Sequence, residues 1–418
     1  MSSPPKHPQP TDPPVKSKHR RLVWGPVAAL AVLAVAGAAV GARVETEPLP
    51  PASTVTLLRA DVHLPGPPAY LAWPTQGEAA LATSEGRLIG SSGPATAVPI
   101  ASVTKVMTAY VVLSDHPLTR SQGGPVLVIT ASEAAHVAAR LAAGQSVIAV
   151  HAGETFDEHQ ALQALLLASA NNMATALARF DAGSKAAFVA KMNSTAAALG
   201  MTQTHFADAS GYDAGSVSDP TDLLALARAA MRVPAFAAIV RQAKANIPGV
   251  ATFANYNTLV GEDGFTGIKT GSTEPAGGAL LFSVTRDVGG RPLSIDGVVL
   301  QQRSGPLVNA ALDAAKALAD SFYAHLASRT VLSAGTPVAT ITRAGRHSTV
   351  STTAPLQVLA LPGTIVRLRV TVRAPQPGTP DWHAEVGAGA LTGVASVKAW
   401  GPVPPPPRLS WRLRHLLG

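Results

Sequence analysis

Apolar residues recur along the chain in three different patterns, and each pattern predicts a different part of the molecule. Residues 22–42 carry no charge, and this length is close to the roughly 20 residues that span a bilayer. Residues 67–328 mix short alternating stretches with longer stretches of helical period, which predicts an α+β domain. Residues 329–401 alternate apolar residues with Thr, Gln or Arg between Gly and Pro, which predicts a small all-β domain.

The N-terminal segment has the features of a membrane anchor or of a signal peptide. Residues 1–21 are rich in proline and contain Lys and Arg near their end, so we expect a disordered cytoplasmic tail. Residues 22–42 are longer than the usual apolar core of a signal peptide, which favours a retained transmembrane helix at the cytoplasmic membrane. Residues 40–42 nevertheless resemble a cleavage site, and cleavage would make the protein secreted. Both interpretations place the rest of the chain outside the cytoplasm.

Between these segments, shorter patterns predict individual elements. Strands are predicted at residues 79–83, 87–90, 126–129, 265–270, 278–285 and 293–300. Helices are predicted at residues 102–116, 132–142, 155–167, 185–199, 221–231 and 307–326. We expect Thr155 and Glu158 to form a capping box at the third helix. Residues 43–66 contain several prolines and no clear period, so we expect a linker, and residues 402–418 predict a Pro-rich spacer with a short basic amphipathic tail. This tail would pack against the protein or touch a membrane.

Composition narrows the possible chemistry. The 418 residues include no cysteine, which excludes disulfides, thiolate metal sites and a cysteine nucleophile. The formal charge is +8, but no basic stripe with interleaved aromatic residues is present, so we expect no nucleic-acid partner. A basic exported protein is more simply explained by an anionic wall or membrane surface. His151, His159 and His205 lack metal-ligand spacing, and we expect neither a metal ion nor a cofactor.

Ser102 and Lys105 are the first candidate catalytic residues. They stand three residues apart at the start of a predicted helix, where positions i and i+3 are neighbours. A serine hydroxyl is a weak nucleophile until a base takes its proton, and a lysine with a lowered pKa can be that base. Ser3 and Lys6 repeat the spacing, but they stand among prolines in the predicted tail and cannot form a site.

Two further short motifs follow in order. They are Ser169-Ala170-Asn171, after a predicted helix, and Lys269-Thr270-Gly271, in a predicted strand. Each motif alone is more often structural, as a helix cap, a turn or a strand end. A closely similar set of three motifs characterises penicillin-binding proteins and class A β-lactamases.

At these residues the chain resembles the D-alanyl-D-alanine carboxypeptidases, the low-molecular-mass penicillin-binding proteins. The resemblance covers about residues 67–303 and extends to the stretches around residues 165–172, 191–211 and 267–277. Two positions depart from the family pattern. Asn172 stands where many members have Asp, and Ala101 is preceded by isoleucine where the family usually has proline.

The resemblance implies a β-lactamase/transpeptidase-like fold, with an antiparallel sheet and a helical cluster, and an acyl-transfer reaction. Ser102 would attack the terminal D-Ala-D-Ala bond of a peptidoglycan stem peptide, and β-lactams would act as inhibitors. Lys105 would be the base, kept neutral by burial and by the charge of Lys269. Ser169 would pass a proton to the leaving D-alanine, and Asn171 would orient the substrate amide and the base.

The third motif would bind the substrate. Lys269 and Thr270 would hold its terminal carboxylate, and Gly271 would let its backbone lie against the strand. The backbone N–H groups of Ser102 and Ser272 would form the oxyanion hole. Arg303 is a further candidate for contact with the carboxylate.

Two alternatives remain open at this point. The chain could be an endopeptidase, a transpeptidase or a β-lactamase of the same superfamily, although no glutamate is placed as the deacylating base of a class A β-lactamase. It could also be a catalytically silent wall-binding scaffold whose β domain makes the functional contacts. The complete set of motif residues argues against a silent scaffold.

Overall fold

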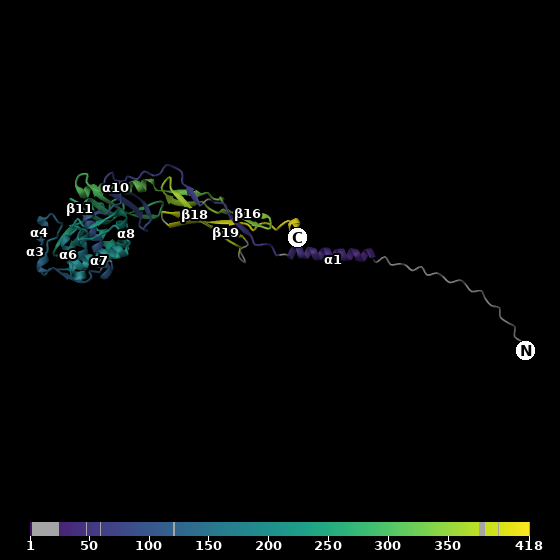
Figure 1. The fold of residues 1–418 in the computed structure, drawn as a ribbon, viewed down its shortest axis with the longest axis horizontal. Helices are drawn as coiled ribbons and strands as arrows, with labels where there is room; N and C mark the ends of the chain where they lie inside the picture. The colour runs from purple at the N-terminus through teal and green to yellow at the C-terminus, as the bar shows by residue number, and fades with distance from the viewer. Residues whose placement is uncertain are drawn as a thin grey trace.

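The computed structural model describes residues 1, 25–46, 48–58, 60–119, 122–375, 381–391 and 393–417. Most of the predicted tail, including Ser3 and Lys6, and the first three residues of the apolar segment lie outside the described residues. A mixed α/β body occupies one end of the molecule, and a body of long strands follows it (Figure 1). Helix α1 (Gly25–Thr46) projects from the far end of that second body.

A five-stranded antiparallel sheet forms the centre of the mixed body, in the order β11-β12-β13-β3-β4. Its strands are β3 (Glu78–Thr83), β4 (Leu88–Ser92), β11 (Phe265–Thr273), β12 (Gly277–Asp287) and β13 (Pro292–Gln302). Strands β13 and β3 join two hairpins that lie far apart in the sequence. The predicted strands of this sheet are confirmed, and β11 is left as an edge strand.

Helices cover both faces of this sheet. On one face, α10 (Leu307–His325) packs on β12 and β13 around buried Phe282 and Phe322. On the other face, residues such as Ile268 and Leu281 join the core of a helical cluster. The main helices of the cluster are α2 (Lys105–Asp115), α5 (Glu158–Leu166), α6 (Asn171–Ala182), α7 (Lys185–Ala198), α8 (Pro220–Met231) and α9 (Pro234–Val240). Burying each large apolar side chain contributes about 1.5–3 kcal/mol.

Short elements lie around the cluster. They are β5 (Val98–Pro99), β6 (Val126–Val128), α3 (Ala131–Ala135), α4 (Val137–Ala142), β7 (Thr155–Asp157), β8 (Val217–Ser218), β9 (Lys244–Ile247) and β10 (Ala251–Ala254). The helix predicted at residues 132–142 is therefore two shorter helices. The helix predicted from Ser102 begins as a 3₁₀ turn, η1 (Ala101–Thr104), and continues as α2.

The capping box expected from Thr155 and Glu158 is wrong. Thr155 is extended in β7, where it pairs with Val128 of β6, and so it cannot cap a helix. The helix starts later, and Asp157 and Gln160 form the box instead. The Gln160 N–H donates to Asp157 Oδ1 at 2.7 Å, and the Asp157 N–H donates to Gln160 Oε1 at 3.0 Å.

The second body is an antiparallel sheet in the order β1-β15-β16-β20-β19-β18-β2, with β14 and β17 paired beside it. Its strands are β1 (Ser53–Thr56), β2 (Asp61–His63), β14 (Ala327–Leu332), β15 (Pro337–Arg343), β16 (Arg346–Thr352), β17 (Leu356–Ala360), β18 (Ile365–Arg373), β19 (Trp382–Ala390) and β20 (Gly393–Gly401). The predicted linker, residues 43–66, is thus wrong in part, because it supplies both edge strands, β1 and β2. These strands are short and mostly exposed, so they carry no alternating apolar pattern.

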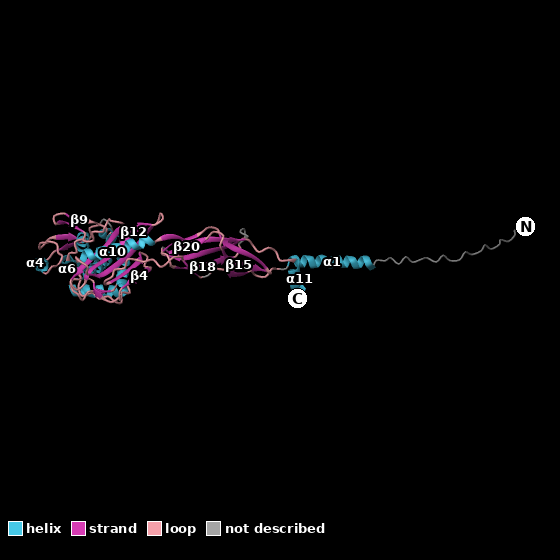
Figure 2. Ribbon diagram, turned by 90° about the horizontal axis from the view of Figure 1, so that it is seen from above, coloured by secondary structure: helices cyan, strands magenta, loops and turns pink. Residues whose placement is uncertain are grey.

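The two ends of the described chain meet at the far side of this sheet. Helix α1 is long and apolar enough to cross a membrane, with a mean hydropathy of 2.1 over Val27–Thr46 and 6% of that window buried. Helix α11 (Leu409–Leu417) lies beside the end of α1 (Figure 2). Arg412 donates to the carbonyls of Val44 and Glu45, which the last turn of α1 leaves without helical partners. The predicted basic tail is therefore a helix that contacts α1.

Candidate active site

The nucleophile candidate lies in a tight turn. Residues i and i+3 of a 3₁₀ turn are eclipsed, so Ser102 in η1 and Lys105 at the start of α2 face the same side. Lys105 Nζ lies 2.8 Å from Ser102 Oγ and donates to the carbonyl of Ser210 at 2.7 Å. Lys105 is fully buried. Its amine is therefore fixed between a hydroxyl group and a carbonyl group.

Two buried lysines shape the electrostatics of the site. Burial and the nearby charge of Lys269 hold the pKa of Lys105 well below its usual range, with a smaller lowering from Arg140 and an opposing effect of Asp208. Burial lowers the pKa of Lys269 to about 7. Among the described residues, no carboxylate forms a hydrogen bond with either amine. The lowered pKa favours the neutral form of Lys105, which is the form that a base requires.

The second motif forms the turn between α5 and α6. Ser169 is 3% exposed and has a φ of +58°, a left-handed conformation that costs non-glycine residues of order 1 kcal/mol. Asn171 is the first residue of α6, which packs against α2, the helix that begins with Lys105. Asn171 Nδ2 donates to Gln145 Oε1 at 3.0 Å. Its Oδ1 is buried and forms no hydrogen bond among the described residues.

The third motif lies on edge strand β11, next to the nucleophile. A Cβ atom added to Gly271 would lie 2.9 Å from the Ile100 carbonyl and 3.1 Å from the Ser102 amide nitrogen. The missing side chain therefore allows β11 to approach the backbone of η1. Lys269 is 1% exposed and donates to the carbonyl of Thr270 at 2.9 Å. The structure thus brings the first and third motifs together at one edge of the sheet.

The remaining predicted residues lie at the end of β11. Ser272 follows Gly271 on the strand and is exposed. Arg303 stands just after β13 and donates to the carbonyls of Glu274 and Pro275 at 2.9 and 2.8 Å. Its guanidinium therefore holds the turn between β11 and β12, at residues that follow Lys269 and Thr270 along the chain.

The structure adds residues that the sequence did not single out for the site. Ser210 acts through its main-chain carbonyl, which carries no side-chain signal. Gly211 has a φ of +75°, and an added Cβ would lie 1.7 Å from the carbonyl oxygen of Ala101. Gln145 holds the amide of Asn171 from a separate loop. In the described part of the chain, no group of three or more His, Asp and Glu side chains is placed to hold a metal ion.

Sequence comparison points to one family. The D-alanyl-D-alanine carboxypeptidase family matches residues 77–303 of this chain. The chain is 35% identical over 174 residues to a D-alanyl-D-alanine endopeptidase of Pseudomonas aeruginosa, covering 40% of this chain and 53% of that protein. It is 33% identical over 217 residues to D-alanyl-D-alanine carboxypeptidase DacB2 of Mycobacterium tuberculosis, covering 50% of this chain and 69% of that protein. The chain spans about half the length of the Pseudomonas relative.

Solved structures agree on the fold. A Streptomyces DD-transpeptidase matches with a TM-score of 0.53 and 26% identity, over 60% of this chain and 99% of that one. A penicillin-binding protein homologue from Mycobacterium tuberculosis matches with a TM-score of 0.51 and 29% identity, over 63% of this chain and 94% of that one. The expected transpeptidase-like α+β fold is confirmed.

Proposed function

Because the chain belongs to the D-alanyl-D-alanine carboxypeptidase family, we propose that it is a serine carboxypeptidase that removes the terminal D-alanine from peptidoglycan stem peptides. The observation that carries this proposal is the 2.8 Å separation between Ser102 Oγ and the amine of Lys105. Lys105 is fully buried and its pKa is lowered, so it is a base in contact with a nucleophile. Lys105 is buried and no carboxylate among the described residues pairs with it, which a purely structural role would not require.

The acylation step follows from this arrangement. The Ser102 hydroxyl donates its proton to neutral Lys105 while Oγ forms a bond to the carbonyl carbon of the penultimate D-alanine. The carbonyl oxygen becomes an oxyanion, which accepts hydrogen bonds from the N–H groups of Ser102 and Ser272. The C–N bond then breaks, the proton held by Lys105 moves through the Ser169 hydroxyl to the leaving amine, and an ester on Ser102 remains. The Ser210 carbonyl accepts an N–H of Lys105, which leaves the amine lone pair for Ser102.

The same geometry supports substrate binding at the third motif. Lys269 and Thr270 would hold the terminal carboxylate, and a bound anion would raise the pKa of Lys269 from about 7 back toward the charged form. The unpartnered Oδ1 of Asn171 would accept the substrate amide N–H. Arg303 would complete the carboxylate site only if it released a carbonyl of the β11–β12 turn. Water would finally hydrolyse the ester and release the shortened peptide.

The proposed location follows from helix α1. Its exposed apolar surface fits a single-pass anchor in the cytoplasmic membrane, with the N-terminus cytoplasmic and residues 67–328 outside as the catalytic domain. Residues 329–401 would form the β domain, with β1 and β2 as its edges. Cleavage after this helix would instead make the protein secreted.

The test is a covalent adduct followed by a product assay. Full-length protein in detergent micelles should form a penicillin adduct that peptide mass spectrometry locates at Ser102, and Ser102→Ala should abolish it. The unmodified protein should release D-alanine from a pentapeptide that ends in D-Ala-D-Ala. Labelling at another residue would refute the mechanism, and an adduct without D-alanine release would refute the carboxypeptidase assignment.

Endopeptidase activity is the second candidate function. The Pseudomonas aeruginosa relative, at 35% identity, is a D-alanyl-D-alanine endopeptidase. Both activities would use the same acyl-enzyme, and they differ in the group that leaves. A cross-linked peptide dimer separates them, because an endopeptidase converts the dimer to monomers whereas a carboxypeptidase leaves the cross-link intact. A cross-linked product formed from monomers would indicate a transpeptidase.

A further inference from the structure

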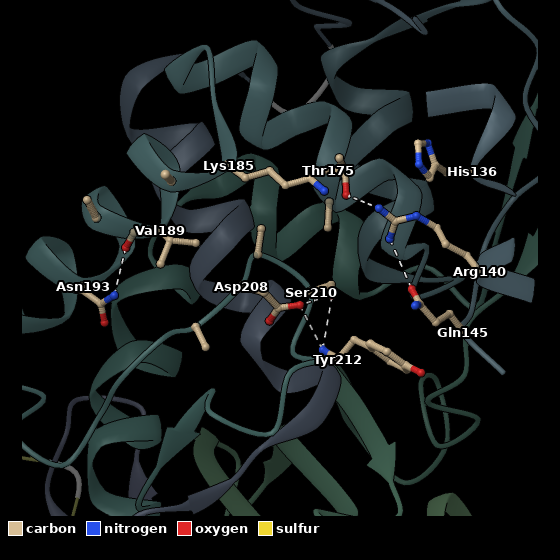
Figure 3. A pocket seen from close by; sticks show the side chains of 15 residues that line it. His136, Arg140, Gln145, Thr175, Lys185, Val189, Asn193, Asp208, Ser210 and Tyr212 are labelled. Atoms are coloured by element: carbon tan, nitrogen blue, oxygen red, sulfur yellow. Dashed lines mark hydrogen bonds between the residues drawn. The ribbon is translucent and has the colours of Figure 1, made fainter. Parts of the chain in front are cut away.

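A cavity of about 790 Å³ lies between α6, α7 and the loop that carries Ser210 (Figure 3). Ser210 forms part of its wall, and the carbonyl of the same residue holds Lys105. Gln145, the partner of Asn171, forms another part. Neither Ser102 nor Lys105 lines the cavity, but Ser210 and Gln145 belong to its wall and also contact residues of the proposed active site.

Two cations line this cavity, and neither has an ion-pair partner in the part of the chain that the structure describes. Arg140 is half-buried and donates only to neutral groups, at 3.2 Å to Gln145 Oε1 and at 2.8 Å to Thr175 Oγ1. Lys185, the first residue of α7, extends its amine along the same wall toward Thr175 (Figure 3). Among the described residues, no carboxylate lies within ion-pair distance of either side chain.

The carboxylates nearby are already engaged. Asp208 accepts from the Ser210 hydroxyl at 2.5 Å and from the Gly211 N–H at 2.7 Å, so its oxygens are turned into its own loop. Glu133, in the hollow next to the cavity, accepts from Arg179 at 2.8 Å. Asp208 also lines the cavity, but it forms no ion pair with Arg140 or Lys185 among the described residues. The lining therefore carries two basic side chains and one carboxylate, and this excess of positive charge favours an anionic ligand.

A hydrogen-bonded chain connects this wall to the proposed active site. Gln145 Oε1 accepts from Arg140 Nη1 and also from Asn171 Nδ2. A shift of the Arg140 guanidinium would therefore move Gln145 and with it the amide of Asn171. The Oδ1 of this amide is the proposed acceptor for the substrate. An anion held by Arg140 would stabilise this chain in its present arrangement.

We propose that the cavity binds a free carboxylate of the peptide substrate, located upstream of the bond that is cleaved. Arg140 would bind the carboxylate through its planar fork and Lys185 would add a second charge-assisted hydrogen bond. Tyr212, which is 46% exposed at the cavity wall and donates to the Ala143 carbonyl, offers a ring surface for the peptide. This inference rests on the proposed function, and it makes the enzyme selective for acidic stem peptides.

Two pentapeptides test this selectivity. Both end in D-Ala-D-Ala, and they differ only in whether the second residue is D-glutamate with a free α-carboxylate or its α-amide. We expect kcat/KM of the unmodified, full-length enzyme to be about tenfold higher for the acid, the combined effect of the partly exposed contacts from Arg140 and Lys185. Lys185→Gln should reduce this ratio to about threefold, because Arg140 remains. Lys398→Gln, an equal charge change on the exposed face of β20, should leave the ratio at about tenfold.

A binding measurement separates this inference from the proposed function. Full-length Ser102→Ala protein in detergent micelles should bind the acid about tenfold more tightly than the amide by calorimetry, and Lys185→Gln in that background should reduce the difference to about threefold. If both peptides bind and react equally, or if Lys185→Gln keeps the full ratio, the carboxylate site is refuted while the carboxypeptidase function stands. If the binding preference is present but no D-alanine is released, the site stands and the proposed function is refuted.

Discussion

Gly211 supplies the sharpest test of how the loop at residues 207–212 supports the catalytic pair. This glycine has a φ of +75°, and a Cβ atom there would lie 1.7 Å from the Ala101 carbonyl oxygen and 2.6 Å from Thr104 Oγ1. Ordinary contacts begin at 3.4 Å, so Gly211→Ala must move the loop and η1 apart by about 1.7 Å. Both sides of that contact carry parts of the proposed catalytic pair. Ala101 precedes Ser102, and the carbonyl that holds Lys105 belongs to the residue before Gly211.

The expected effect can be worked out in two terms. The left-handed conformation costs an alanine about 1–2 kcal/mol, and the overlap adds about 1–3 kcal/mol of overpacking. We therefore expect Gly211→Ala to lower the free energy of unfolding by about 3 kcal/mol. Displacing a nucleophile from its base by about 1 Å can cost about 100-fold in rate, so acylation by a fluorescent penicillin should slow by at least about that factor.

Gly200 provides the matched control. It has a φ of +77°, but no atom lies within 4 Å of an added Cβ. Gly200→Ala should therefore show the conformational cost of about 1 kcal/mol without slowing acylation. Thermal denaturation and the second-order acylation rate are measured for both variants. Equal stability losses together with an unchanged acylation rate in Gly211→Ala would refute the view that this close contact positions Ser102 and Lys105.

Three further outcomes follow from the titrating and polar groups. The proposed mechanism needs neutral Lys105 and charged Lys269, so kcat/KM for D-alanine release should rise through the lowered pKa of Lys105 and fall above about pH 7. A pH profile that still rises at about pH 9 would contradict this. Burial raises the pKa of Glu158 from 4.5 to about 8, so the folded protein should lose stability as the pH rises through this range. Denaturant titration should find Glu158→Gln about 2–4 kcal/mol more stable than the unmodified protein at about pH 9, but not at about pH 5. Asn172 donates to the Ile148 carbonyl at 2.9 Å, so Asn172→Asp should lower the free energy of unfolding by about 2 kcal/mol at neutral pH. Part of this stability should return in acid, where the aspartate is protonated and can donate. An unchanged melting temperature at neutral pH would show that this contact is not needed.

The structure explains the two departures from the family pattern, Asn172 and Ile100, by different contacts. Asn172 uses both ends of its amide on the main chain of Ile148, donating from Nδ2 and accepting the Ile148 N–H at 3.2 Å on Oδ1. An aspartate could not make the first of these bonds, so in this chain the asparagine fits its surroundings. Ile100, where the family usually has another residue, is fully buried in the core of the helical cluster. Its side chain is therefore a packing element rather than part of the site.

The sequence by itself determined the features that depend on near neighbours. Ser102 and Lys105 are three residues apart, so any helical turn brings them together, and the structure has them in contact. The apolar pattern likewise predicted helix α1 and the strands of the central sheet, because their periods are properties of short stretches. Where a local pattern was absent, as in short exposed strands β1 and β2, prediction failed.

Only the tertiary structure decided which distant groups complete the site. The carbonyl that holds Lys105 comes from Ser210, 105 residues away, and a main-chain carbonyl has no signature in a sequence. The approach of Gly271 to the Ser102 amide depends on β11 being the edge strand beside η1. The cavity wall of Arg140 and Lys185 exists because the fold brings α4 and α7 to the same cavity beside α6, where Arg140 donates to Thr175, and no spacing of residues records that packing. Short segments of the sequence thus predict the candidate catalytic residues, whereas the groups that surround these residues are determined by long-range packing.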